Sequence, residues 1–206
     1  MAEELIANGK CDMCMIGRPN LCDSEFANKA FEDKVDDIRP CIGCGRCLTG
    51  IMMGKRIGCT VNPSVEDDTI APAETKKKVL VIGGGPAGME AAYVAKKRGH
   101  EVVLCEKSNE LGGQLRLAAV PIAKQELCKV IKFMIRRLDH EGIEIRLNTE
   151  VTKERLENEF KDYEIVCSSG ATPKEIPPFK VFKNCMTADD VLSGKKYPGR
   201  NIVVLG

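Results

Sequence analysis

The strongest constraint on this fold is a glycine-rich turn between an apolar segment and an alanine-rich one. Lys78 to Ile82 is apolar enough for a buried strand, and Pro86 to Arg98 is typical of a helix. Between them, Gly83-Gly84-Gly85-Pro86-Ala87-Gly88 supplies the pattern GxGxxG. In such a unit the first glycine permits the tight turn, the second lets the backbone approach a pyrophosphate, and the third allows close helix–strand packing. The motif predicts an α/β domain that binds a dinucleotide.

The sequence after this turn continues as alternating strands and helices. Glu101 to Cys105 and Tyr163 to Cys167 predict strands, and Ile143, Ile145 and Leu147 alternate as in a half-exposed strand. Apolar residues between Lys124 and Asp139 have the spacing of an amphipathic helix. Strands that alternate with helices imply a parallel sheet. One more apolar strand is predicted at Asn201 to Leu205.

Several residues of this region are candidates for binding the dinucleotide. Glu106 follows the second strand, where its carboxylate can accept hydrogen bonds from ribose hydroxyls. Leu111-Gly112-Gly113-Gln114 resembles the second glycine pair of two-dinucleotide flavoproteins, and Ser169 to Pro173 resembles their Ala-Thr-Gly motif. On that resemblance the nucleotide is FAD. The expected binding residues are Gly83, Gly85, Pro86, Ala87, Gly88, Glu106, Lys107, Gly113, Gln114, Lys124, Gly170 and the backbone at Val151.

Cysteine is over-represented, with 11 residues in the chain. An odd number cannot all pair as disulfides within one chain, and the polar start of the sequence has no signal-peptide pattern. The cytoplasm is therefore the expected location, and metal binding is a better explanation than cross-linking. The net charge of +1 offers no basic field for nucleic acid, and no apolar run is long enough to span a membrane.

Four of the cysteines have the spacing of a metal site. Cys41, Cys44 and Cys47 form CxxCxxC, and Cys59 follows in a Gly-Cys-Thr sequence. Three thiolates at this spacing suit one face of a [4Fe–4S] cubane, and a distant fourth cysteine completes the ligand set. Structural zinc is the alternative, although zinc sites more often use two separated CxxC pairs.

The other cysteines are interpreted as structural. Cys11 and Cys14 fall on a predicted strand from Cys11 to Ile16, which would put them on opposite faces, and Cys22 lies before a predicted helix at Ser24 to Glu32. All three are expected to be small buried residues. Core or incidental positions are expected for Cys105, Cys128, Cys167 and Cys185.

The motifs together resemble one known family. Arg39 to Cys44, the downstream Cys59 and the glycine fingerprint resemble the family of 2,4-dienoyl-CoA reductase, NADH:flavin oxidoreductase and trimethylamine dehydrogenase. Met15 to Pro19 is similar to the last strand and loop of that family's TIM barrel, where Gly17 and Arg18 would bind the FMN phosphate. The implied organisation is the end of an FMN barrel (1–40), a Cys-rich cluster segment and linker (41–76), a Rossmann-like FAD-binding domain with a parallel sheet (77–199) and the first strand of an NAD(P)H domain (200–206).

The resemblance implies an electron relay from NAD(P)H through FAD and the cluster to FMN, which reduces an enoyl- or dienoyl-type small-molecule substrate. The CxxCxxC spacing resembles the dehydrogenase branch, in which ADP can replace FAD. Without the rest of the barrel and an NAD(P)H domain, the chain is expected to bind cofactors poorly and to be inactive alone. An electron-transfer subunit, a non-catalytic nucleotide-binding fragment and a homo-oligomer remain open alternatives, and no catalytic residue is assigned.

Overall fold

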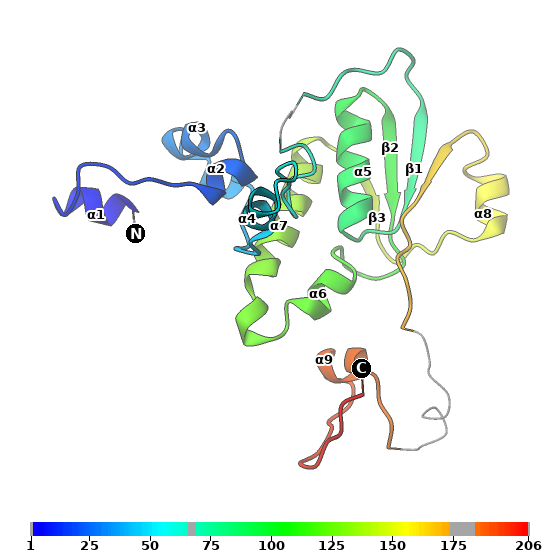
Figure 1. Ribbon diagram of the computed structural model, residues 1–206. Helices are drawn as coiled ribbons and strands as arrows, with labels where there is room; N and C mark the ends of the chain where they lie inside the picture. Colours follow the sequence, from blue (N-terminus) through cyan, green and yellow to red (C-terminus); the bar gives the residue numbers. More distant parts are fainter. Residues whose placement is uncertain (1, 66–68, 174–183, 206) are drawn as a thin grey trace. The chain divides into compact units, whose positions relative to one another are not determined.

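The computed structural model describes residues 2–65, 69–173 and 184–205, drawn in Figure 1. These residues form two compact units, Met1–Thr69 and Ile70–Gly206. The division falls within residues 41–76, which the sequence predicts as a Cys-rich cluster segment and linker. Among the described residues, no helix has both the length and the apolar character that crossing a membrane requires.

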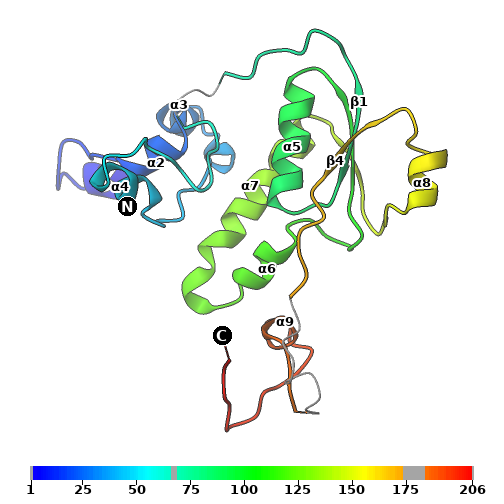
Figure 2. The same ribbon diagram turned by 45° about the vertical axis from the view of Figure 1, so that its right-hand side comes forward.

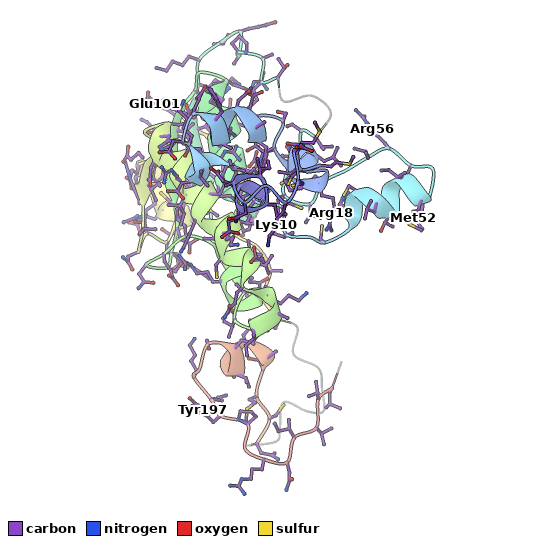
Figure 3. The ribbon with its side chains drawn as sticks, turned by 90° about the vertical axis from the view of Figure 1, so that its left-hand side faces the viewer. Lys10, Arg18, Met52, Arg56, Glu101 and Tyr197 are labelled. Atoms are coloured by element: carbon purple, nitrogen blue, oxygen red, sulfur yellow. The ribbon has the colours of Figure 1, made fainter. Side chains whose placement is uncertain are left out.

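The first unit is built from short helices joined by loops. Its elements are α1 (Ala2–Ala7), α2 (Arg18–Cys22), α3 (Phe26–Phe31), the 3-10 helix η1 (Val35–Asp37) and α4 (Arg46–Met52). The helix predicted at Ser24 to Glu32 corresponds to α3. Helix α4 was not predicted; it is short, contains a glycine and begins after Gly45, which is in the left-handed region at φ 75°. Met52 lies at the end of α4, where Figure 3 labels it, and is 87 % exposed.

The predicted strand from Cys11 to Ile16 is wrong. These residues pair with no strand in the described part of the unit, and a strand needs a partner for its backbone N–H and C=O groups. The two cysteines also do not lie on opposite faces, because the Sγ atoms of Cys11 and Cys14 are 3.6 Å apart. Both side chains are half-buried.

A buried carboxylate organises the loops of this unit. Asp23 accepts hydrogen bonds from the Arg39 N–H at 2.7 Å, the Glu25 N–H at 3.1 Å and the Lys29 ammonium at 2.7 Å. Burial opposes ionisation of Asp23, but these donors outweigh it and lower the pKa of the carboxyl group. The carboxylate therefore connects the end of α2 to α3 and to the segment that leads into Cys41.

Replacing Asp23 with Asn is expected to destabilise this unit by about 2–3 kcal/mol at neutral pH, because buried donors lose a charged acceptor. Since the folded pKa is lowered, the contribution of Asp23 is present above the unfolded value of about 3.9 and is lost as pH falls through the folded value. Hydrogen exchange of first-unit peptides across acidic pH measures this. Asp162→Asn, on an exposed residue of the second unit, is the control. Equal protection of Asp23→Asn and the unmodified chain at neutral pH would contradict the assignment.

The second unit is an α/β structure around a four-stranded parallel sheet, as predicted. The sheet has the order β3-β2-β1-β4 and consists of β1 (Lys78–Ile82), β2 (Glu101–Cys105), β3 (Glu144–Arg146) and β4 (Glu164–Cys167). The chain crosses between successive strands through α5 (Pro86–Lys97), then through α6 (Gln114–Ala118), η2 (Ile122–Lys124) and α7 (Glu126–His140), and then through α8 (Lys153–Asn158). Figure 2 shows β1 and β4 side by side.

Alternation along the strands divides the core between two faces of the sheet. Val79 and Val81 of β1 pack in a cluster with Met89 of α5 and Leu138 of α7. The residue between them, Leu80, packs on the other face in a cluster that contains Val103, Cys105, Phe160 and Leu156. Successive side chains of a strand point to opposite faces, so one apolar run supplies both layers. Cys105 is thus a core residue, as predicted.

Helices α5 and α7 are also joined by a charged pair. The Arg137 guanidinium donates to both carboxylate oxygens of Glu90, at 2.9 and 3.3 Å, and lies over the Tyr93 ring with 3.4 Å from Cζ to the ring centroid. The two charged side chains are only 12 % and 22 % exposed. This bidentate contact fixes how the two helices cover the sheet.

The last described segment contains α9 (Ala188–Leu192), which begins with a capping box formed by Thr187 and Asp190. The strand predicted at Asn201 to Leu205 is wrong for the described residues, because none of these residues pairs with a neighbouring strand. Val203 and Val204 are 85 % and 84 % exposed, so this apolar run has no packing partner in the described chain.

Candidate functional sites

The glycine-rich turn between β1 and α5 is held by close backbone packing. Gly83 has φ 104°, in the left-handed region, and its N–H donates to the Cys105 carbonyl at 2.8 Å. A Cβ on Gly88 would overlap the Gly83 carbonyl oxygen, and a Cβ on Gly84 would overlap Leu111. These positions therefore require glycine for internal packing. Pro86 and Ala87 begin α5, where Pro suits the first turn because its missing N–H is not needed.

Gly85 differs from its neighbours because a Cβ there would meet nothing within 4 Å. Its backbone, with φ −73° and ψ 177°, is open to any residue, so nothing internal demands glycine. The position faces open space at the beginning of a twelve-residue helix. Exposed N–H groups and the helix dipole favour an anion there, so the site fits a pyrophosphate that approaches the Gly85 backbone.

The second glycine pair packs directly against this turn. The Gly112 N–H donates to the Gly84 carbonyl at 2.8 Å, and a Cβ on Gly113 would come within 3.2 Å of the Gly85 Cα. Gly112 and Gly113 both have positive φ, at 115° and 52°. The two motifs, separate in sequence, thus form one surface at the carboxyl end of β1, where open α/β sheets bind ligands.

Glu106, at the end of β2, is part of the same surface and is 7 % exposed. Its Oε2 accepts from the Gly84 N–H at 2.6 Å, and its Oε1 accepts from the Ser108 N–H and Oγ at 2.8 and 2.7 Å. Burial opposes ionisation, but these donors lower the pKa of the carboxyl group. A carboxylate oxygen has two acceptor positions, so Oε2 keeps one for a further donor.

The other residues predicted to bind the dinucleotide lie elsewhere in the second unit. Gln114 Nε2 donates to the carbonyl of Ala171, the residue after Gly170, at 2.7 Å. Gln114 and Ala171 both line a pocket, whose other lining residues are Leu117, Ala118, Thr172, Pro173, Asp189 and Leu192. Val151 packs beside the Leu80 cluster, and the neighbouring Thr149 N–H donates to the Glu106 carbonyl at 2.8 Å. Lys107 and Lys124 are exposed, and no described contact joins Lys124 to the glycine turn.

The four cysteines with metal-ligand spacing are brought together in the first unit. Cys41, Cys44, Cys47 and Cys59 line one pocket, whose other walls are Arg18, Leu21, Ile42, Gly45, Arg46 and Val61. Gly43 and Gly45 have φ 67° and 75°, and these left-handed residues let the backbone wrap around the pocket. Cys47 lies on the first turn of α4, which the sequence did not predict.

Four thiols around one pocket fit an iron–sulfur cluster. Each iron of a cubane cluster takes one thiolate, so its ligands surround a volume instead of converging on a point. Among the described residues, no group of three or more Cys, His, Asp or Glu side chains is arranged to hold one metal ion. The thiols line a mostly apolar pocket, and Cys44 Sγ lies 3.2 Å from Thr60 Oγ1. That hydrogen bond, with one from the Arg46 backbone, lowers the pKa of Cys44 and favours its thiolate.

Two further residues adjoin the cysteine pocket. Arg18, at the start of α2 and labelled in Figure 3, donates from Nη1 to the Gly43 carbonyl at 3.4 Å. The neighbouring Gly17 precedes α2, and the predicted role of this pair at an FMN phosphate stays a prediction.

Cys22 is completely buried, as predicted. Burial and the neighbouring thiols of Cys59 and Cys41 raise its pKa. Its proximity to the pocket cysteines is not visible in the sequence, since 36 residues separate it from Cys59.

Comparison with known proteins identifies the class. Residues 78–176 match the family described as FAD dependent oxidoreductase. The chain is 37 % identical to cinnamate reductase of Clostridium sporogenes over 100 % of its own length, and 38 % identical to NADH oxidase of Thermoanaerobacter brockii over 94 %. By sequence the chain thus belongs with the flavin-dependent oxidoreductases.

The structural comparison agrees. A 2-naphthoyl-CoA reductase solved with 2-naphthoyl-CoA matches 95 % of the chain with a TM-score of 0.89 and 33 % identity. The chain belongs to the family of 2,4-dienoyl-CoA reductase, NADH:flavin oxidoreductase and trimethylamine dehydrogenase. It spans 31 % of the length of each of these three relatives.

Proposed function

We propose that this chain is part of a flavin and iron–sulfur oxidoreductase in which electrons from NAD(P)H reach an enoyl- or dienoyl-type substrate through FAD, a [4Fe–4S] cluster and FMN. The observation that carries the proposal is the pocket lined by Cys41, Cys44, Cys47 and Cys59 in a chain whose other unit has an open glycine turn. The names of the relatives include reductases of cinnamate and of 2-naphthoyl-CoA, which supports a conjugated carbonyl substrate.

The residues of the second unit supply the parts of a dinucleotide site. The N–H groups at the start of α5 would bind the pyrophosphate, and the open face of Gly85 would let it approach. Glu106 is held ionised by Ser108 and Gly84, so it would accept from ribose hydroxyls instead of donating to them. Gly112 and Gly113 would support this turn, through the hydrogen bond from Gly112 to Gly84 and the close approach of Gly113 to Gly85.

The residues of the first unit would hold the cluster. Cys41, Cys44, Cys47 and Cys59 would supply one thiolate for each iron, and Leu21, Ile42 and Val61 would form the apolar part of the pocket wall. When bound, a flavin exchanges a hydride or single electrons and the cluster exchanges single electrons, so together they can couple a two-electron donor to a one-electron path. Gly17 and Arg18 would bind the FMN phosphate in this arrangement.

Cofactor analysis of anaerobically purified protein tests the proposal. We expect about four iron and four sulfide per chain, with FAD in the nucleotide released by acid. Stoichiometric zinc without sulfide would contradict the cluster. ADP in place of FAD would contradict the flavin step in this chain while leaving the nucleotide site in place.

Replacing Glu106 with Ala is expected to weaken dinucleotide binding by roughly 1–3 kcal/mol, because ribose hydroxyls lose a charged acceptor. Glu106→Gln is the matched control, since it keeps the shape and one acceptor oxygen but removes the charge. Its affinity for the dinucleotide should lie between those of Glu106→Ala and the unmodified chain. Equilibrium titration of the apoprotein with FAD measures the effect. Unchanged affinity in Glu106→Ala would exclude this carboxylate from the site.

A further inference from the structure

We propose that Cys11 and Cys14 are a dithiol site, which forms a reversible disulfide by exchange with a low-molecular-weight disulfide such as glutathione disulfide. The two cysteines are separate from the four that line the pocket, so the inference goes beyond the proposed function and does not rest on it. It gives a chemical role to two residues that the sequence analysis interprets as structural.

The two thiols lie close together across a short loop. The Sγ atoms of Cys11 and Cys14 are 3.6 Å apart, and only Asp12 and Met13 separate the two residues in the sequence. A disulfide needs about 2.0 Å between its sulfur atoms, so the two atoms must approach each other by roughly 1.6 Å. Side-chain rotation and a small shift of the loop can supply that movement.

The backbone of this loop is not held by regular secondary structure. Cys11 to Ile16 belong to no helix and pair with no strand in the described part of the unit, so a shift there breaks no ladder of hydrogen bonds. The chain also bends at Asp12. In a straight strand, residues three apart point to opposite faces, whereas here the two thiols meet.

The site is accessible to a small reactant. Cys11 and Cys14 are both half-buried, and Met13 and Met15 beside them are 82 % and 100 % exposed. Cys22, by contrast, has no exposed surface. Exchange requires direct attack of a thiolate on a disulfide sulfur, so it should occur at the first two cysteines and not at Cys22.

The exchange balances in two steps. The thiolate of one cysteine attacks a sulfur of glutathione disulfide, which forms a mixed disulfide and releases one glutathione. The other cysteine then attacks the protein sulfur of the mixed disulfide and releases the second glutathione. Two protein thiols are oxidised, one glutathione disulfide is reduced, and the two thiol protons end on the two glutathione products. An excess of reduced glutathione reverses both steps.

The test follows this site in the complete chain. Anaerobically purified protein is equilibrated with mixtures of reduced glutathione and glutathione disulfide and is then denatured in excess iodoacetamide. Trypsin cleaves after Lys10 and Lys29 but not between Arg18 and Pro19, so one peptide contains Cys11, Cys14 and Cys22. As the share of glutathione disulfide rises, we expect tandem mass spectrometry to show a link between Cys11 and Cys14, with Cys22 alkylated. Dithiothreitol should remove the link.

Variants with one thiol of the pair should stop at the first step. In Cys11→Ser and Cys14→Ser the second attack is impossible, so at least one of the two variants should retain glutathione on its remaining cysteine. Cys128→Ala is the control, because it removes an exposed thiol of the other unit and should leave the link unchanged. Absence of glutathione from the remaining cysteine in both serine variants would overturn the inference.

The unmodified chain gives a result that does not depend on how the variants fold. If Cys11 and Cys14 are both alkylated, or each carry glutathione, in excess glutathione disulfide, the inference is wrong. A link from either residue to any other cysteine would also overturn it. Iron and sulfide measured on the same samples keep the two proposals apart. A Cys11–Cys14 link in protein without iron would support this inference and contradict the cluster, whereas a full cluster with both thiols alkylated would overturn this inference alone.

Discussion

Replacement of Cys44 with alanine is expected to remove the [4Fe–4S] cluster from this chain. One iron would lose its only protein ligand, and Cys44 has the thiolate-favouring hydrogen bond from Thr60. Iron and sulfide should fall from about four per chain to a small fraction of that, with loss of the broad visible absorbance near 400 nm that the family resemblance leads us to expect. The measurements are iron and acid-labile sulfide assays and the anaerobic absorption spectrum.

The matched control is Cys128→Ala. Cys128 is also exposed, but it lies on α7 in the other unit, so this substitution removes one thiol without touching the pocket. Its iron and sulfide content should equal that of the unmodified chain. Full iron and sulfide in Cys44→Ala would exclude Cys44 from the ligand set, whereas equal losses in both variants would mean that the loss is not specific to the pocket.

Replacement of Gly85 with valine is expected to abolish dinucleotide binding while leaving the fold intact. A Cβ at this position meets nothing within 4 Å, and its φ of −73° is ordinary for valine. The branched side chain would instead occupy the space through which the pyrophosphate approaches the backbone. The affinity for FAD should fall by at least about 100-fold, or about 3 kcal/mol, with little change in the thermal unfolding of the apoprotein.

Gly88→Ala provides the opposite control in the same turn. A Cβ on Gly88 would overlap the Gly83 carbonyl oxygen, so this smaller substitution should destabilise the second unit itself. Circular dichroism of the apoproteins distinguishes the two, with a lower unfolding temperature in Gly88→Ala than in Gly85→Val. Normal flavin retention in Gly85→Val would mean that the nucleotide does not bind at this turn.

Elements whose signals are local could be predicted from the sequence. The strands β1 and β2 and the helices α5 and α7 were predicted to within a few residues, because an apolar run and a helical spacing describe the element that contains them. The positions that require glycine could also be predicted, because the tight turn and the close helix–strand packing of a strand–turn–helix unit require glycine. The parallel sheet followed from the order of these elements.

The errors have a common physical cause. Cys11 to Ile16 and Asn201 to Leu205 are apolar enough for strands, yet a strand exists only when another strand pairs with it, and the described residues supply none. Helix α4 was missed for the opposite reason, because its glycine and cysteine content gives a weak local signal.

The sequence by itself determined which residues could hold a cluster and a dinucleotide, because ligand spacing and glycine content are local properties of the chain. Only the tertiary structure decided how each group is surrounded. It brought Gly84 against Glu106, Gly112 against the turn, and the four spaced cysteines around one pocket. Such contacts join residues that are distant in sequence, and they depend on packing over the whole unit, which no local pattern encodes.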